Sequence, residues 1–107
     1  MKIQLITLNG CGRCAKLKED LSNNNIVFTN TSCDENPNQC DSLESLLGID
    51  DYPMVLITDK ADRILEILYI AKSYEMIGKN KDFDGGVTGI PVHSIDNMID
   101  YIKNKLN

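Results

Sequence analysis

The chain has 107 residues, 42% of them hydrophobic, and a formal net charge of −5 at pH 7. This length and apolar content are typical of one globular domain, residues 1–107, and they exclude a chain that is disordered throughout. Nucleic acids and anionic membranes are bound by basic surfaces, so the acidic balance disfavours both as partners. We expect a monomer.

The N-terminal sequence MKIQLITLNG holds an apolar run that is too short and too polar for a signal peptide. No apolar stretch reaches the length of a transmembrane helix. We therefore expect a cytoplasmic protein, whose thiols are kept reduced. In that compartment, closely spaced cysteines indicate catalysis or metal binding before they indicate structural disulfides.

The first elements follow from the hydrophobic pattern. Residues 2–8 are apolar on both faces, which predicts a central strand covered by helices. A helical pattern begins at Cys11, and its apolar face is formed by Ala15, Leu17 and Leu21. The three asparagines 23–25 end this helix, and the apolar residues 26–28 start a second strand.

A second helix is expected after a polar turn region at residues 32–41. Asp41 lies three residues before Glu44, which is the spacing of a capping box. The helix ends at Gly48, and its buried face is formed by Leu43, Leu46 and Leu47.

The next segments predict two strands and a loop. Pro53 heads the apolar run 54–57, a third strand, because proline is tolerated at the first residue of a strand. Residues 63–71 fit either a helix or a strand, and the hairpin-like connection before them favours a strand. The mostly polar residues 72–92 predict a long loop.

Ser94 caps a last helix, whose buried residues are Ile95, Met98, Ile99, Ile102 and Leu106. The elements follow the order β-α-β-α-β-β-α. Such alternation of strands and helices predicts an α/β fold in one domain.

Two of the four cysteines, Cys11 and Cys14, lie in the stretch NGCGRCAKL, between the first strand and the first helix. Unpaired N–H groups at a helix start would stabilise the thiolate of Cys11, and Arg13 adds a nearby cation. Cys11 is thus the expected nucleophile with a lowered pKa, and Cys14 the thiol that resolves its mixed disulfide. The pair predicts a thiol–disulfide oxidoreductase.

Three other residues suggest weaker alternatives. A four-cysteine zinc site usually needs a second closely spaced pair, but six residues separate Cys33 from Cys40. We therefore expect no metal site and two unrelated thiols; a Cys-ligated zinc or iron–sulfur centre and a secondary Cys33–Cys40 disulfide stay open as alternatives. His93, the only histidine, is expected to be a solvent-facing turn residue, because exchange driven by a thiolate needs no general base.

The sequence resembles the glutaredoxin-like branch of the thioredoxin superfamily over nearly its whole length. The matching features are the strand 3–8, the CGRC motif at a helix start, Tyr52-Pro53 before the strand 54–57, and the terminal helix. The resemblance implies a thioredoxin-like fold, with a central four-stranded mixed sheet flanked by helices. It also implies that Pro53 is cis and packs against the cysteines, and that Tyr52 and Pro53 form one wall of the substrate groove.

The resemblance also implies the partners. The expected substrates are protein disulfides or glutathione mixed disulfides, with Arg13, Tyr52 and Pro53 as binding residues and no bound cofactor. Glutathione is the expected reductant, and a thioredoxin-reductase-type enzyme is the second choice. A non-catalytic binding module that holds a partner in the same groove is the alternative from another class. In two places the sequence departs from the pattern of the family: Gly-Arg replaces Pro-Tyr between the cysteines, and Gly85-Gly86 does not lead directly into the last helix.

Overall fold

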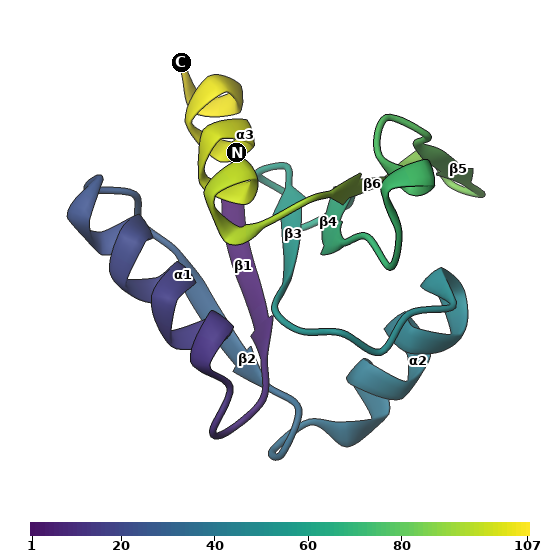
Figure 1. Ribbon diagram of the computed structural model, residues 1–107, viewed down its shortest axis with the longest axis horizontal. Helices are drawn as coiled ribbons and strands as arrows, with labels where there is room; N and C mark the ends of the chain where they lie inside the picture. Colours follow the sequence, from purple (N-terminus) through teal and green to yellow (C-terminus); the bar gives the residue numbers. More distant parts are fainter.

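The computed structural model describes residues 1–107 and contains a six-stranded sheet with three α-helices (Figure 1). The strands are β1 (Lys2–Thr7), β2 (Thr29–Ser32), β3 (Met54–Thr58), β4 (Ile64–Ile70), β5 (Lys81–Phe83) and β6 (Val87–Val92). The helices are α1 (Gly12–Asn23), α2 (Pro37–Leu47) and α3 (Ile95–Leu106), with a short 3₁₀ helix η1 (Tyr74–Met76) between β4 and β5. The α/β class is therefore confirmed.

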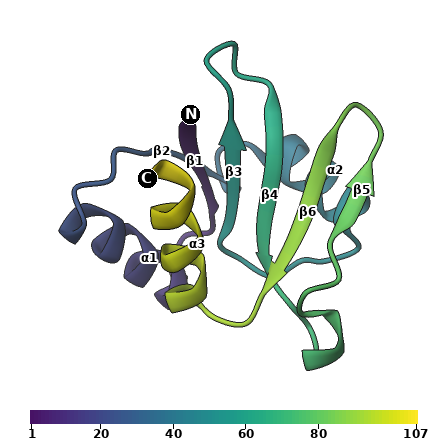
Figure 2. The ribbon, with the colours of Figure 1, turned by 90° about the horizontal axis from the view of Figure 1, so that it is seen from above.

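The sheet is mixed, and its strand order is β2-β1-β3-β4-β6-β5. Strands β1 and β2 are parallel, β3 is antiparallel to both of its neighbours, and β6 runs parallel to β4 (Figure 2). The first four strands form the expected four-stranded sheet. The expectation that the sheet stops there was wrong, because β5 and β6 extend it on the β4 side.

The two additional strands come from residues 72–92, which we expected to form a loop. Strands β5 and β6 are antiparallel, with Phe83 opposite Val87, and the turn between them contains Gly85 and Gly86. Both glycines have positive φ angles, of 86° and 82°, a conformation that residues with a side chain rarely adopt. The sequence Asp84-Gly85-Gly86 is thus a hairpin signal that the polar composition of the segment obscured.

Helices cover the sheet on both faces. Helices α1 and α3 pack side by side on one face, and α2 lies on the other (Figure 1). The β1 side chains alternate accordingly, since Ile3 and Leu5 join the core under α1 and α3, whereas Ile6 joins the core under α2. A central strand that is apolar on both faces is what residues 2–8 predicted.

Helix α2 begins earlier than the sequence suggested. Its first residue is Pro37, and Asn36 precedes it without capping the helix through its side chain. Proline is well suited to the first helical position because its fixed φ angle is helical and its missing N–H would have no partner there. The expected start after Asp41 was therefore wrong. The expected end was correct, since Gly48 terminates the helix in the left-handed conformation, with φ of 68°.

The other boundaries follow the sequence more closely. Helix α1 ends at Asn23, whereas β2 begins at Thr29, one residue after the apolar stretch expected to start it. Ser94 caps α3, and its hydroxyl oxygen accepts a hydrogen bond of 3.2 Å from the N–H of Asn97. Leu106, which we expected to be buried, is exposed, and so is Ala15, which we expected on the apolar face of α1. None of the helices combines the length and the apolar character that a membrane span needs.

The two adjacent leucines at the end of α2 give a direct test of which helix face is buried. Leu47 is 1% exposed, whereas Leu46, which we expected to be buried, is 48% exposed. Leu47→Ala should lower the free energy of unfolding by about 2–5 kcal/mol, as core leucine truncations do. Leu46→Ala is the matched control and should cost less than about 1 kcal/mol. Urea denaturation of both variants measures the difference, and equal losses would contradict the assigned face.

Candidate active site

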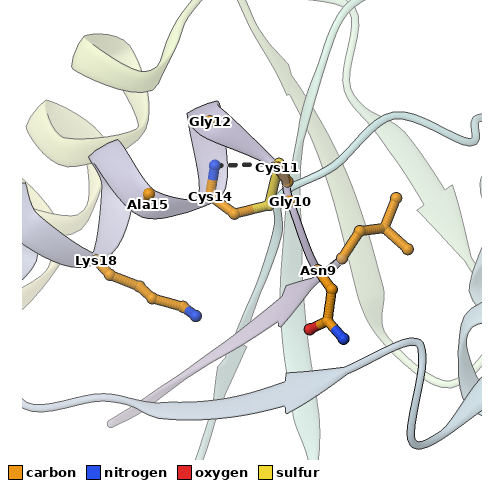
Figure 3. Close-up of a pocket in the computed structure, with 8 residues that line it drawn as sticks. Asn9, Gly10, Cys11, Gly12, Cys14, Ala15 and Lys18 are labelled. Atoms are coloured by element: carbon orange, nitrogen blue, oxygen red, sulfur yellow. Dashed lines mark hydrogen bonds between the residues drawn. A yellow bond between two sulfur atoms is a disulfide. The ribbon is translucent and has the colours of Figure 1, made fainter.

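The CGRC motif lies where β1 ends and α1 begins (Figure 3). Gly10 has a positive φ of 74°, which allows the chain to turn sharply out of the strand. Cys11 is the N-cap residue of α1 and Cys14 lies in the first turn. The two cysteines form a disulfide, with their Cα atoms 5.2 Å apart. The structure therefore contains the oxidised form of the pair.

The two sulfur atoms have different surroundings. The side chain of Cys11 is half-buried, whereas Cys14 is only 2% exposed. The backbone N–H of Cys14 donates a hydrogen bond of 3.1 Å to Sγ of Cys11 (Figure 3). Because an N–H donor at a helix start stabilises a thiolate more than a thiol, this contact favours ionisation of Cys11 in the reduced protein. The reachable sulfur is thus the one that the backbone stabilises as an anion.

The loop before β3 contacts Cys11 from the other side. The Tyr52–Pro53 peptide bond is cis, as the resemblance implied. The carbonyl oxygen of Tyr52 lies 3.8 Å from Sγ of Cys11. The backbone of Tyr52 therefore faces the cysteine pair.

The side chain of Tyr52 is buried rather than presented at the surface. It is 4% exposed and belongs to the core under α2, where its hydroxyl donates a hydrogen bond of 2.7 Å to Glu44. Burial raises the pKa of Tyr52, and the bond to Glu44 raises it further, because both disfavour the phenolate. The ring cannot contact a substrate at the surface, so only the backbone of this residue can line a groove.

Arg13 connects the cysteine motif to the same loop. Its guanidinium group lies 4.0 Å from the carboxylate of Asp51, and both side chains are substantially exposed. Such an exposed pair contributes little stability, so the guanidinium group remains available to other anions. Arg13 is the cation closest in sequence to both cysteines.

Two hollows flank the motif. The first, of about 380 Å³, is formed around the cysteines by the loop after β1 and the outer face of α1, and its lining includes Leu8, Asn9, Cys11, Cys14 and Lys18 (Figure 3). The second, of about 290 Å³, lies between α1 and the start of α3, and its lining includes Arg13, Lys16, His93, Ser94 and Asp96. An ion pair of 3.2 Å between Lys16 and Asp96 joins the two helices there. A small ligand on the motif has room on either side of it.

The other cysteines do not behave as expected. Cys33 and Cys40 form a second disulfide, with Cα atoms 5.7 Å apart, so the expectation of two unrelated thiols was wrong. Cys40 lies in the first turn of α2, and the unexpected helix start at Pro37 turns it towards the core. No three His, Cys, Asp or Glu side chains come together in an arrangement that could hold a metal ion.

His93 lies exposed before the Ser94 cap, in agreement with its expected place in a turn. Its Nε2 atom lies 3.1 Å from the hydroxyl oxygen of Tyr74, and the two rings are 4.6 Å apart. Tyr69 is fully buried, whereas Tyr74 is 76% exposed. Sequence reasoning missed this pair because Tyr74 and His93 are separated by the unexpected hairpin.

Among the comparisons with known proteins, one gives a match, and that match includes the residues described above. No curated protein and no solved structure matches the chain significantly. The sequence model of the glutaredoxin family matches residues 3–61, which is more than half of the chain and includes both the cysteine motif and the cis-proline. The unmatched part begins just before β4 and contains the added β5–β6 hairpin. The chain therefore belongs to the glutaredoxin family, which consists of α/β proteins with a thioredoxin-like fold.

Proposed function

We propose that the protein is a thiol–disulfide oxidoreductase, with Cys11 as the nucleophile and Cys14 as the resolving thiol. One observation carries the proposal: the half-buried Cys11 sulfur accepts a backbone N–H at the start of α1, while Cys14 is buried beside it. Membership of the glutaredoxin family supports the same reaction type. Because a thiolate is the reactive species in disulfide exchange, the stabilised sulfur is the one that attacks.

The reaction consists of four thiol–disulfide exchanges, which together balance. The Cys11 thiolate attacks one sulfur of a substrate disulfide, forming a mixed disulfide and releasing the other substrate sulfur as a thiolate, which takes a proton from water. Cys14 then loses its proton and attacks Sγ of Cys11, which releases the second substrate sulfur and forms the Cys11–Cys14 disulfide. Two external thiols reduce this disulfide and leave as a disulfide themselves.

Glutathione mixed disulfides and protein disulfides are the proposed substrates, in the cytoplasm, with glutathione as the external thiol. Glutathione is an extended, acidic peptide, and Arg13 offers an exposed guanidinium group that could bind a carboxylate. The backbone of Tyr52 beside Pro53 offers polar groups to a peptide that lies along the cis-proline loop. These three residues are the proposed binding residues.

The decisive experiment supplies a glutathionylated peptide to the reduced protein with one of two reducing systems. Glutathione with its reductase should sustain turnover, whereas thioredoxin reductase should support little or none. Cys11→Ser should abolish turnover, because the attacking sulfur is lost. Cys14→Ser should retain Cys11 as a glutathione mixed disulfide that mass spectrometry detects.

Two results would reject the proposed function. One is the absence of turnover with both reducing systems while circular dichroism reports a folded protein. The other is turnover that survives Cys11→Ser. A third result, turnover with thioredoxin reductase alone, would keep the reaction type and replace glutathione as the proposed reductant.

Arg13 and Asp51 allow a test in which one substitution should weaken substrate binding and the other should strengthen it. Arg13→Ala should raise KM for the glutathionylated peptide about threefold, as expected for the loss of one exposed charge pair. Asp51→Asn should lower KM, because the guanidinium group loses a competing carboxylate. Both effects should shrink at high salt. Lys103→Ala, which removes an exposed cation of α3, is the control and should leave KM unchanged. If Asp51→Asn raises KM, Arg13 does not bind the substrate in this way.

A further inference from the structure

The second disulfide lies beneath an exposed turn. Cys33 directly follows β2, and Cys40 lies on the inner side of the first turn of α2. Their exposed fractions are 7% and 3%, and both belong to the same apolar core as Cys14. All residues between them, 34–39, are exposed. Local opening of this short turn would therefore bring the bond into contact with dissolved thiols.

The turn closed by this disulfide holds the loop that leads to the nucleophile. The N–H of Cys33 donates a hydrogen bond of 2.8 Å to the carbonyl oxygen of Thr7, the last residue of β1. The N–H of Asn9 donates a hydrogen bond of 2.8 Å to the carboxylate of Asp34. Asn9 lies two residues before Cys11 and lines the same hollow. The hydroxyl group of Ser32 adds a longer hydrogen bond, of 3.5 Å, to the side-chain oxygen of Asn9. The carboxylate of Asp34 is thus one of the groups that hold the loop before Cys11, and it makes the shorter of the two bonds to Asn9.

We propose that Cys33 and Cys40 form a second redox centre, whose disulfide keeps Asp34 bonded to Asn9 and so keeps Cys11 in its reactive position. A disulfide limits the motion of the loop it closes. With the bond intact, the turn that carries Asp34 is fixed at both β2 and α2. With the bond reduced, only hydrogen bonds retain the turn, and the loop before Cys11 loosens. This inference rests on the proposed role of Cys11 as the nucleophile.

The redox step needs only the chemistry already proposed for the site. Two thiolates of a small thiol such as glutathione reduce the Cys33–Cys40 bond in two exchanges and leave as one disulfide. In the reverse direction, glutathione disulfide takes two electrons from the two cysteines, which lose two protons, and yields two thiols. The half-buried Cys11 makes the first disulfide easier to reach, so it should be reduced before the second.

A titration in glutathione redox buffers, extended with dithiothreitol, tests the second centre in the wild-type protein. Acid quenching, maleimide labelling and peptide mapping count the thiols at each position. The expected result is a form with two thiols, at Cys11 and Cys14, followed under stronger reduction by a folded form with four. Four thiols under all conditions, a second disulfide that is reduced only on unfolding, or its reduction before the first would each overturn the proposal.

The rate of alkylation of Cys11 by iodoacetamide tests the coupling without any substrate. The form with four thiols should react about fivefold more slowly than the form with two, as expected for the loss of one hydrogen bond that positions the loop. Asp34→Ala should give the slow rate even with the second disulfide intact. Glu35→Ala is the matched control, because that adjacent exposed side chain forms no hydrogen bond, and it should keep the fast rate.

The outcomes separate this inference from the proposed function. Equal alkylation rates in the two forms, or an Asp34→Ala variant that reacts like the wild type, would overturn the coupling and leave the activity of Cys11 intact. If the alkylation rates differ as expected while the protein reduces no disulfide, the second centre stands and the proposed function fails.

Discussion

The hydrogen bond from the N–H of Cys14 to Sγ of Cys11 is the interaction on which the proposed chemistry of this protein depends. It exists because the chain leaves β1, turns at Gly10 and begins α1 with Cys11 as the N-cap. An N-cap side chain accepts an N–H that the helix itself cannot satisfy. A serine or aspartate usually occupies this position, and a sulfur placed there gains a donor that favours its anion.

The topology brings the other parts of the site to this sulfur. Strands β1 and β2 are parallel and β3 is antiparallel to β1, so the ends of β1 and β2 and the start of β3 lie at one edge of the sheet. Three segments consequently meet there: the CGRC loop, the turn closed by Cys33 and Cys40, and the cis-proline loop. Contacts between neighbouring segments join them, through Asp34 on one side and the carbonyl group of Tyr52 on the other. The proposed nucleophile and the proposed second redox centre thus lie at the same edge of the sheet.

Local signals allowed much of the fold to be predicted. The Ser94 cap with its apolar periodicity defined the last helix, Gly48 defined the end of α2, and Pro53 marked the start of β3, because each residue has a backbone preference that few contexts override. The β5–β6 hairpin was missed because its edge strand has only three residues and its polar composition suggested a loop. The position of the CGRC motif at the start of a helix was also predictable from the change of periodicity after β1.

The second disulfide was only an alternative in the sequence analysis, because its formation depends on where α2 begins. The sequence offered two possible starts for α2, a capping box at Asp41 and a proline at the first helical position, and the structure has the proline. Cys40 consequently lies inside the helix, where it forms the disulfide with Cys33. The hydrogen bond between Asn9 and Asp34 was not predicted at all, since it joins residues that only the parallel pairing of β1 and β2 brings together. The spacing of residues along the sequence does not indicate contacts between residues that strand pairing brings together.

Titration of the Cys11 thiol measures whether the start of α1 stabilises the thiolate. The Cys14→Ser variant retains the backbone N–H that contacts the sulfur, and it leaves Cys11 as the only free thiol when the Cys33–Cys40 disulfide is intact. Ultraviolet absorbance of the thiolate, followed as the pH is raised, should give a pKa of about 7 or below. A pKa at or above about 8.5, that of free cysteine, would show that the start of α1 does not stabilise the Cys11 thiolate.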